Sequence, residues 1–226
     1  MDGGLLLNSI MAALSEVGLE TVLIGNAGAA IQGAPVTTVD FDFMFRATPM
    51  NVAKLKKFAD CLEAVILSPC YLASRFYRVV NDDRGLQADF APAIHGAKSF
   101  EDIRSRAEKV QLSGRSLWVA SLADIIASKR ATGRPQDKAV VGILEATLRQ
   151  RTAARAPRPA RPPIRDGPHA ASPGKASGPG KRAAALSALR KESDHALVDL
   201  IRRRLALPVE KRMNFLRVRL PGGSAL

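Results

Sequence analysis

The chain has 226 residues, of which 34 are basic and 21 acidic, so its formal net charge is +13. A hydrophobic fraction of 46% excludes wholesale disorder. The sequence contains no run of about 18 apolar residues, so we predict no membrane span. The first residues lack the basic segment of a secretory signal and two cysteines are too few for a disulfide framework, so we expect a cytoplasmic protein in a reducing environment.

The excess positive charge lies in the last third of the sequence. Residues 1–150 carry a net charge of +1, residues 151–182 of +7 and residues 183–226 of +5. Because the composition changes at the same places, we expect three parts: a folded domain at 1–150, a Pro/Ala/Arg-rich linker at 151–182 and a basic helical segment at 183–226. The net charge therefore says little about the chemistry of the first domain.

The expected linker is poor in residues that form a core. It contains seven Pro, four Gly and seven Ala, and Ile164 is its one large aliphatic residue. Such a segment buries too little apolar area to offset the entropy lost on ordering, so we predict a long disordered linker. Two interpretations of its basic residues stay open, namely a solvated spacer and a basic arm that contacts RNA or DNA.

In the first half of the domain, the hydrophobic spacing alternates between helical and strand periods. Apolar residues at helical spacing predict a helix over 8–16, and the apolar run at 21–24 predicts a strand. A glycine-rich turn at 25–28 leads into a short helix, and alternating Phe and Asp residues at 39–45 predict a second strand. Thr48, followed by a proline, predicts the start of the next helix.

The second half of the domain predicts two hairpins and three helices. The hairpins are expected at 76–90 and 109–119, around turns that contain Asp or Gly. Ser99 and Ser121 each precede an Asp by three residues and predict helix starts, and a last helix is expected over 136–150. Strands with helices around them predict an α+β (α/β mixed-sheet) domain.

Three acidic residues and one turn carry the candidate chemistry. Asp40 and Asp42 are two residues apart on a predicted strand, so their side chains point to the same side. Carboxylates so placed repel each other, and Mg²⁺ with phosphate oxygens is a suitable partner. Asp89, on a later strand, would complete a two-metal site that holds a triphosphate and lowers the pKa of an attacking hydroxyl. The turn at Gly25 and Asn26 offers backbone N–H groups to phosphate.

Together these parts predict the transfer of a nucleotidyl group from an NTP. The alternative is that Asp40 and Asp42 are merely the solvated face of an edge strand.

The sequence around these residues resembles a known superfamily. Residues 23–33 (LIGNAGAAIQG) and 37–43 (TTVDFDF) are similar to the pattern of nucleotidyltransferases related to DNA polymerase β. They are more closely similar to the minimal bacterial branch that includes AbiEii-type toxins of toxin–antitoxin and abortive-infection systems. The resemblance covers about residues 20–148 and implies the minimal nucleotidyltransferase fold.

This resemblance implies roles for individual residues. Asp40, Asp42 and Asp89 would be the metal ligands and the catalytic carboxylates, with Asp89 assisting the attacking hydroxyl. Gly25 and Asn26 would bind the nucleotide. Asn26 departs from the family, which usually has Gly or Ser at that position, and full activity depends on whether Asn can replace them.

A second stretch, residues 120–130 with 133–137, also resembles this family. The equivalent lysine of the family lies near the nucleotide phosphates, which makes Lys129 a candidate catalytic and nucleotide-binding residue. Arg134 is a further nucleotide-binding candidate, and the alternative is that it pairs with Asp137 and braces two helices. The resemblance implies Mg²⁺ as cofactor, in a two-metal site, and an NTP, with ATP binding included, as substrate.

The C-terminal segment has an apolar stripe at helical spacing. Residues 181–206 predict a helix that Pro208 ends, and a short helix is expected at 209–216. About 40 residues are too few for a core of their own, so the stripe packs on the first domain or on another protein. The segment also looks like the short helical proteins that accompany such nucleotidyltransferases, which suggests a fusion of an enzyme with an antitoxin-like partner.

Our leading expectation is a Mg²⁺-dependent nucleotidyltransferase that transfers NMP to a hydroxyl of an RNA, such as a tRNA, or of a protein, within a toxin–antitoxin or abortive-infection system. One alternative is a catalytically weak or inactive nucleotidyltransferase fold that binds a toxin or an RNA. Another is a nucleic-acid-binding protein that acts through residues 151–226 and binds less tightly as salt rises.

Overall fold

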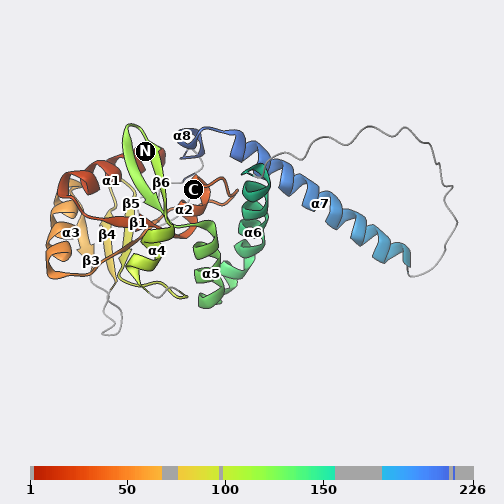
Figure 1. Cartoon of the computed structure of the whole chain (residues 1–226), viewed down its shortest axis with the longest axis horizontal. Helices are drawn as coiled ribbons and strands as arrows, with labels where there is room; N and C mark the ends of the chain where they lie inside the picture. Colours follow the sequence, from red (N-terminus) through yellow and green to blue (C-terminus); the bar gives the residue numbers. More distant parts are fainter. Residues whose placement is uncertain (1–2, 68–75, 97–98, 156–179, 214–215, 217–226) are drawn as a thin grey trace.

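The computed structural model describes residues 3–67, 76–96, 99–155, 180–213 and 216. Over these residues a seven-stranded sheet is combined with helices (Figure 1), which confirms the predicted mixed-sheet fold class. The helices are α1 (Gly3–Val17), α2 (Gly25–Ile31), α3 (Pro49–Cys61), α4 (Phe100–Arg106), α5 (Leu122–Thr132), α6 (Pro135–Arg155), α7 (Gly180–Ala206) and α8 (Val209–Arg212). The strands are β1 (Thr21–Leu23), β2 (Phe41–Phe45), β3 (Val65–Leu67), β4 (Tyr77–Asn81), β5 (Leu86–Ala91), β6 (Glu108–Leu112) and β7 (Arg115–Val119).

The sheet mixes parallel and antiparallel neighbours. Its strand order is β3-β4-β5-β2-β1-β7-β6. Strand β2 pairs in parallel with β5 and strand β1 with β7, whereas the other neighbouring pairs are antiparallel. The two predicted hairpins form the two ends of this sheet, β4–β5 with β3 at one end and β6–β7 at the other.

Alternation along β2 separates the core from the cleft. Phe41, Phe43 and Phe45 are buried. The Phe43 ring stacks on Phe90 of β5, with ring centroids 5.2 Å apart, and Phe58 of α3 meets Phe90 edge-on at 5.2 Å. Residues i and i+2 of a strand share a face, so the aromatic rings occupy one face of the sheet and Asp42 lies on the other.

Side-chain caps confirm three predicted helix starts. The hydroxyls of Thr48, Ser99 and Ser121 accept hydrogen bonds from the backbone N–H three residues later, at the starts of α3, α4 and α5. Each such cap satisfies one of the N–H groups that the first turn leaves without a helical partner.

Several boundaries differ from the sequence-based expectation. Helix α2 begins at Gly25, so the predicted turn is itself the first turn of that helix. Strand β3 was not predicted, because three residues at an exposed edge carry little periodic signal. Helix α6 continues to Arg155 and thus into the predicted linker, since the Arg151 guanidinium binds Glu108 and Gln32 and holds this turn on the domain. The rest of that linker, residues 156–179, lies outside the described residues.

The end of the C-terminal segment packs on the first domain. Ile201 near the end of α7 is fully buried, and Leu205 lies against Gly33. Arg212 of α8 donates a hydrogen bond to the carbonyl oxygen of Ile31 at 3.1 Å. The last turns of α7 thus pack on the first domain, whereas Leu200 of the same stripe is exposed.

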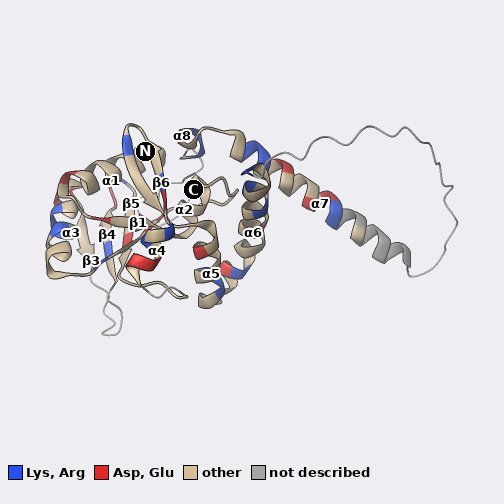
Figure 2. Ribbon diagram, in the orientation of Figure 1, with Lys and Arg blue, Asp and Glu red and all other residues tan. Residues whose placement is uncertain are grey.

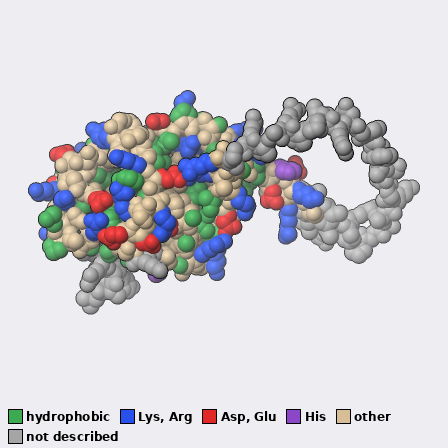
Figure 3. Space-filling view, in the orientation of Figure 1, with side chains coloured by type: hydrophobic (Ala, Val, Ile, Leu, Met, Phe, Trp, Pro, Cys, Tyr) green, Lys and Arg blue, Asp and Glu red, His purple; other side chains and the backbone are tan. Residues whose placement is uncertain are grey.

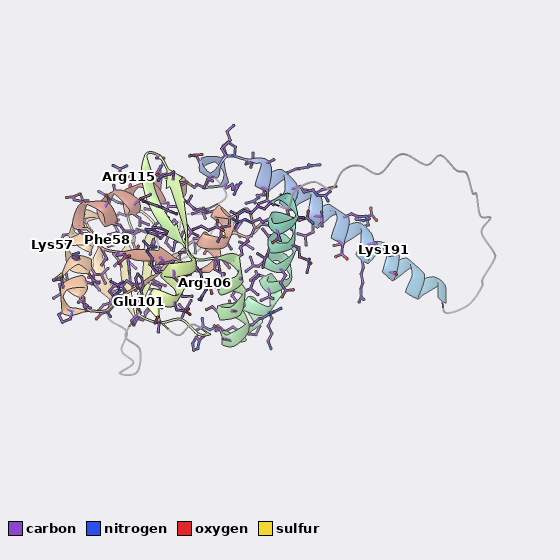
Figure 4. The ribbon with its side chains drawn as sticks, viewed as in Figure 1. Lys57, Phe58, Glu101, Arg106, Arg115 and Lys191 are labelled. Atoms are coloured by element: carbon purple, nitrogen blue, oxygen red, sulfur yellow. The ribbon has the colours of Figure 1, made fainter. Side chains whose placement is uncertain are left out.

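The N-terminal half of α7 extends away from the domain (Figure 1). Lys191 in this half points into solvent (Figure 4). Helix α8 ends at Arg212, earlier than predicted; residues 214–215 and 217–226 lie outside the described residues.

The first domain carries a mixture of positive and negative side chains, as its net charge of +1 predicts. Lys and Arg are interspersed with Asp and Glu over the visible face of the first domain (Figures 2 and 3). In the described ranges, no helix combines the length and the hydrophobicity needed to cross a membrane.

Candidate active site

A cleft of about 650 Å³ contains every residue that the sequence assigned to the site. Its walls come from the start of α2, from β2, β4 and β5, and from α5 and α6. The predicted residues that line it are Gly25, Asn26, Asp40, Asp42, Asp89, Lys129 and Arg134. The structure thus brings the candidates together, and their roles stay predictions.

The three carboxylates lie at the centre of this cleft. One oxygen each of Asp40, Asp42 and Asp89 lies within 4.8 Å of the others. Asp42 and Asp89 are direct neighbours in the parallel pairing of β2 with β5. Asp40 just precedes β2, and the Thr38 hydroxyl donates a hydrogen bond to its Oδ1. Like charges on directly opposite residues destabilise a sheet, so this arrangement calls for a cation.

Arg78 supplies one positive charge and was missed in the sequence. It lies on β4 directly opposite Asp89. Its Nε and Nη2 donate to Oδ1 and Oδ2 of Asp89, both at 2.8 Å, and this hydrogen bonding raises the pKa of Arg78. The hairpin turn that precedes Leu86 sets the register and would have placed Arg78 opposite Asp89.

The positive charge of Arg78 does not balance the negative charge of the three carboxylates. Burial, followed by repulsion from Asp40 and then from Asp89, raises the pKa of Asp42 to about 7, from 3.8. Lys129 and Arg78 act in the opposite direction and lower it. A carboxylate with so high a pKa is stabilised by a proton or by a further cation.

The start of α2 borders the carboxylates closely. Gly25 has a φ of +64°, and a β-carbon at this position would overlap the Asp42 carboxylate. Glycine is therefore required twice, by its backbone angle and by the approach of Asp42. The side-chain oxygen of Asn26 is buried and has no hydrogen-bond partner among the described residues. An unsatisfied polar atom in a cleft marks a position that a ligand can complete.

The positive groups of α5 and α6 face the cleft. The Lys129 Nζ lies 2.9 Å from Asp137 Oδ1, and both side chains are largely buried. Asp137 thus pairs with Lys129, which replaces the expected alternative of an Arg134–Asp137 brace. Arg134 is exposed at the edge of the cleft, and so is His95, on the loop after β5.

The comparisons with known proteins return distant structural similarities. No protein-family model and no curated protein matches the sequence. The solution structure of the antibiotic-resistance factor ANT(2'')-Ia is 20% identical over 68% of this chain and 96% of that chain, with a TM-score of 0.44. The lincomycin-bound crystal structure of the lincosamide antibiotic adenylyltransferase LnuA is 12% identical over 62% of this chain and 94% of that chain, with a TM-score of 0.47.

A Thermotoga maritima protein, named as a candidate nucleotidyltransferase, is 20% identical over 66% of this chain and 92% of that chain, with a TM-score of 0.44. Such low identities and partial overlaps support no conclusion on function. The function proposed below therefore depends on the side chains of the cleft.

Proposed function

We propose that the chain is a metal-dependent nucleotidyltransferase, which transfers the nucleotidyl group of an NTP to a hydroxyl. The observation that carries this proposal is the group of three carboxylates, Asp40, Asp42 and Asp89, within 4.8 Å of one another in a cleft that Gly25 and Lys129 also line. Carboxylates that share a cleft with a cationic wall match the needs of a metal-bound triphosphate.

The donor set fits Mg²⁺. Hard oxygen ligands suit this ion, which is usually held by one or two carboxylates together with substrate phosphates. Asp40 and Asp42 would hold the metal ions, and Asp89 would share one of them. When bound, the metal supplies neutralisation of the triphosphate charge and a lowered pKa for the attacking hydroxyl.

The chain's own groups would place the nucleotide. A cleft of about 650 Å³ falls in the size range of small-molecule sites. Lys129 would neutralise phosphate charge, and Arg134 at the edge of the cleft would contact the nucleotide. Gly25 allows the backbone to approach the phosphates closely, and the buried Oδ1 of Asn26 would accept a hydrogen bond from a donor of the nucleotide, such as a sugar hydroxyl.

Asp42→Asn tests the assignment. We expect transfer from labelled NTP to fall about 100-fold or more, because Mg²⁺ contributes several kcal/mol to transition-state stabilisation and each 1.4 kcal/mol or so is a tenfold change in rate. Asp60→Asn, an exposed carboxylate on α3, is the matched control and should retain the activity. Equal labelling by wild type and Asp42→Asn would refute the proposal.

The acceptor is a finer part of the proposal. We propose a hydroxyl of an RNA, with tRNA as the first candidate, or of a protein, in a toxin–antitoxin or abortive-infection setting. The resemblance of residues 23–33 and 37–43 to the AbiEii-type branch supports it. Incubation of the chain with labelled NTPs and either total tRNA or a protein lysate would identify the acceptor, and label in neither fraction would exclude both.

A second candidate function has one observation in its favour. Arg78 engages both carboxylate oxygens of Asp89, and this arrangement suits a fold that binds a toxin or an RNA without using a metal. Thermal unfolding with and without Mg²⁺ and NTP separates the two functions, because a ligand that binds the folded state raises its stability. A binding module of this kind would show no metal-dependent shift.

A further inference from the structure

A second cavity lies at the other end of α2. It has a volume of about 350 Å³ and is formed where α6 and β6 meet the C-terminal helices α7 and α8. Figure 2 shows Lys and Arg, in blue, on α6, on α8 and on the end of α7 that meets the domain. This volume falls within the range of small-molecule sites, and none of the residues considered so far for catalysis lines it.

Three arginines, one carboxylate and the amide of Gln32 form its polar wall. The Arg151 guanidinium binds Glu108 at 2.7 Å, and Arg155 lies 3.6 Å from the same carboxylate. Glu108 is thus shared between two guanidinium groups. With Arg212 the four groups carry a net charge of +2.

Arg212 is held in place without being neutralised. It donates hydrogen bonds to the carbonyl oxygens of Leu205, Leu207 and Ile31, at 2.8, 3.0 and 3.1 Å. Carbonyl oxygens fix the guanidinium plane but carry no net charge, and no described carboxylate forms an ion pair with Arg212. Burial, and then the nearby Arg151, lowers the pKa of Arg212, and the charge of Glu210 opposes this shift. An arginine so fixed is prepared to bind an anion.

We propose that this cavity binds a small phosphorylated anion, of the size and charge of pyrophosphate, through Arg151, Arg155 and Arg212. The guanidinium fork matches the geometry of phosphate oxygens, and the two excess positive charges match a multiply charged anion. The limited volume favours a small ligand over a nucleic-acid strand. This site is separate from the carboxylate cleft and does not depend on the proposed transfer reaction.

The ligand would connect two parts of the chain. Arg151 and Arg155 belong to α6, whereas Arg212 belongs to the C-terminal segment. An anion bound between them stabilises the packed position of that segment, because it binds the packed state and not the separated one. Arg212 also bonds to the last residue of α2, Ile31, so the anion would fix the far end of the helix that begins at Gly25.

Titration calorimetry of the full chain with inorganic pyrophosphate, in the presence of EDTA, tests this proposal. We expect binding by wild type, and affinity lowered about tenfold or more by Arg155→Gln and by Arg212→Gln, since each removes a charge-assisted hydrogen bond. Arg203→Gln is the matched control: it removes a charge from the same segment but lies exposed and outside the cavity.

The variants also separate this site from the carboxylate cleft. Asp42→Asn should bind pyrophosphate as wild type does, whether or not it transfers nucleotides. Arg155 is 71% exposed, so its substitution tests the site even if Arg212→Gln releases the C-terminal segment. Absence of binding by wild type, unchanged binding by Arg155→Gln, loss of binding in Asp42→Asn, or binding of a short RNA in place of pyrophosphate would each overturn the proposal.

Discussion

The two ends of helix α2 border sites of opposite charge. At its start, Gly25 lies beside Asp42, one of three clustered carboxylates. At its end, Ile31 and Gln32 lie beside three arginines, two of which share the carboxylate of Glu108. The seven residues of α2 separate these two surroundings, so one short helix is in contact with both.

The two sites are also built differently. The carboxylate site is set mainly by pairing within the sheet, because Asp42, Asp89 and Arg78 are neighbours on β2, β5 and β4. The arginine site is assembled from α6 and the C-terminal segment, which are far apart in sequence. The first site therefore forms together with the sheet, whereas the second exists only when the C-terminal segment is packed. The four expectations below test this difference.

The largest effect should come from Asp42→Asn in metal-free buffer. The Asp42 pKa is raised by burial, Asp40 and Asp89, so the folded state binds this proton more tightly than the unfolded state does. Wild type should therefore lose stability as pH rises from about 4 to about 7, by up to about 4 kcal/mol, and the variant should lack this loss. The positive charges of Lys129 and Arg78 lower the Asp42 pKa and so reduce this loss of stability.

Urea unfolding at pH 5 and pH 8 in EDTA measures this. The variant should be more stable than wild type at pH 8, with a smaller difference at pH 5. A difference that is the same at both pH values would show that Asp42 is not destabilised by its ionisation. The stability of Asp60→Asn should change with pH as that of wild type does, so that their difference is the same at pH 5 and pH 8.

Release of the C-terminal segment should be the next largest effect. Ile201 is fully buried, and truncating such a side chain to Ala costs about 2–4 kcal/mol. Because this loss falls on the packing of one segment, hydrogen exchange of the last turns of α7 should accelerate while the sheet stays protected. Leu200→Ala is the control, since Leu200 is 45% exposed. Equal exchange in both variants would contradict the packed position of the segment.

A smaller cost in stability, with a selective effect on activity, is expected at Gly25. Gly25→Ala and Gly114→Ala both place a β-carbon at positive φ, which costs about 1–2 kcal/mol. A β-carbon at Gly114 meets nothing within 4 Å, whereas at Gly25 it overlaps Asp42. Circular-dichroism melts should show losses in both variants, and only Gly25→Ala should lose nucleotidyl transfer. Retained transfer in Gly25→Ala would mean that Asp42 can move freely.

The smallest effect is expected at the helix caps, away from both sites. Ser99→Ala and Ser121→Ala each remove a hydrogen bond to the first turn of a helix and should lower the free energy of unfolding by about 1 kcal/mol. Pyrophosphate binding should be unaffected in both. A loss of binding in either variant would show that the arginine cavity responds to the packing of α4 or α5.

Much of the fold follows from local signals in the sequence. Thr48, Ser99 and Ser121 cap the helices they were predicted to start, because capping is a contact between residues three apart. Alternation of Phe and Asp gave β2 and the side on which Asp42 lies. Local signals fail at β3, whose three residues are too few to show a strand period.

The missed parts of the sites depend on contacts between elements, within one hairpin for Arg78 and between distant segments for the arginine cavity. Arg78 was not singled out, because its importance comes from the register of β4 against β5. The arginine cavity was also missed, since Arg151 was assigned to a linker and Arg212 to a separate segment. No periodicity in one sequence reports that these residues meet.

The register of β2 has a consequence for the fidelity of folding. Its aromatic rings fill the core from one face, and its carboxylate faces the cleft from the other. A slip of one residue against β5 would exchange the faces, so that Asp42 would enter the aromatic core and the three rings would leave it. A misregistered chain is therefore less stable, because it loses the burial of the same aromatic rings that form the native core. The same register brings Asp42 beside Asp89, so correct pairing of β2 with β5 also assembles this part of the cleft.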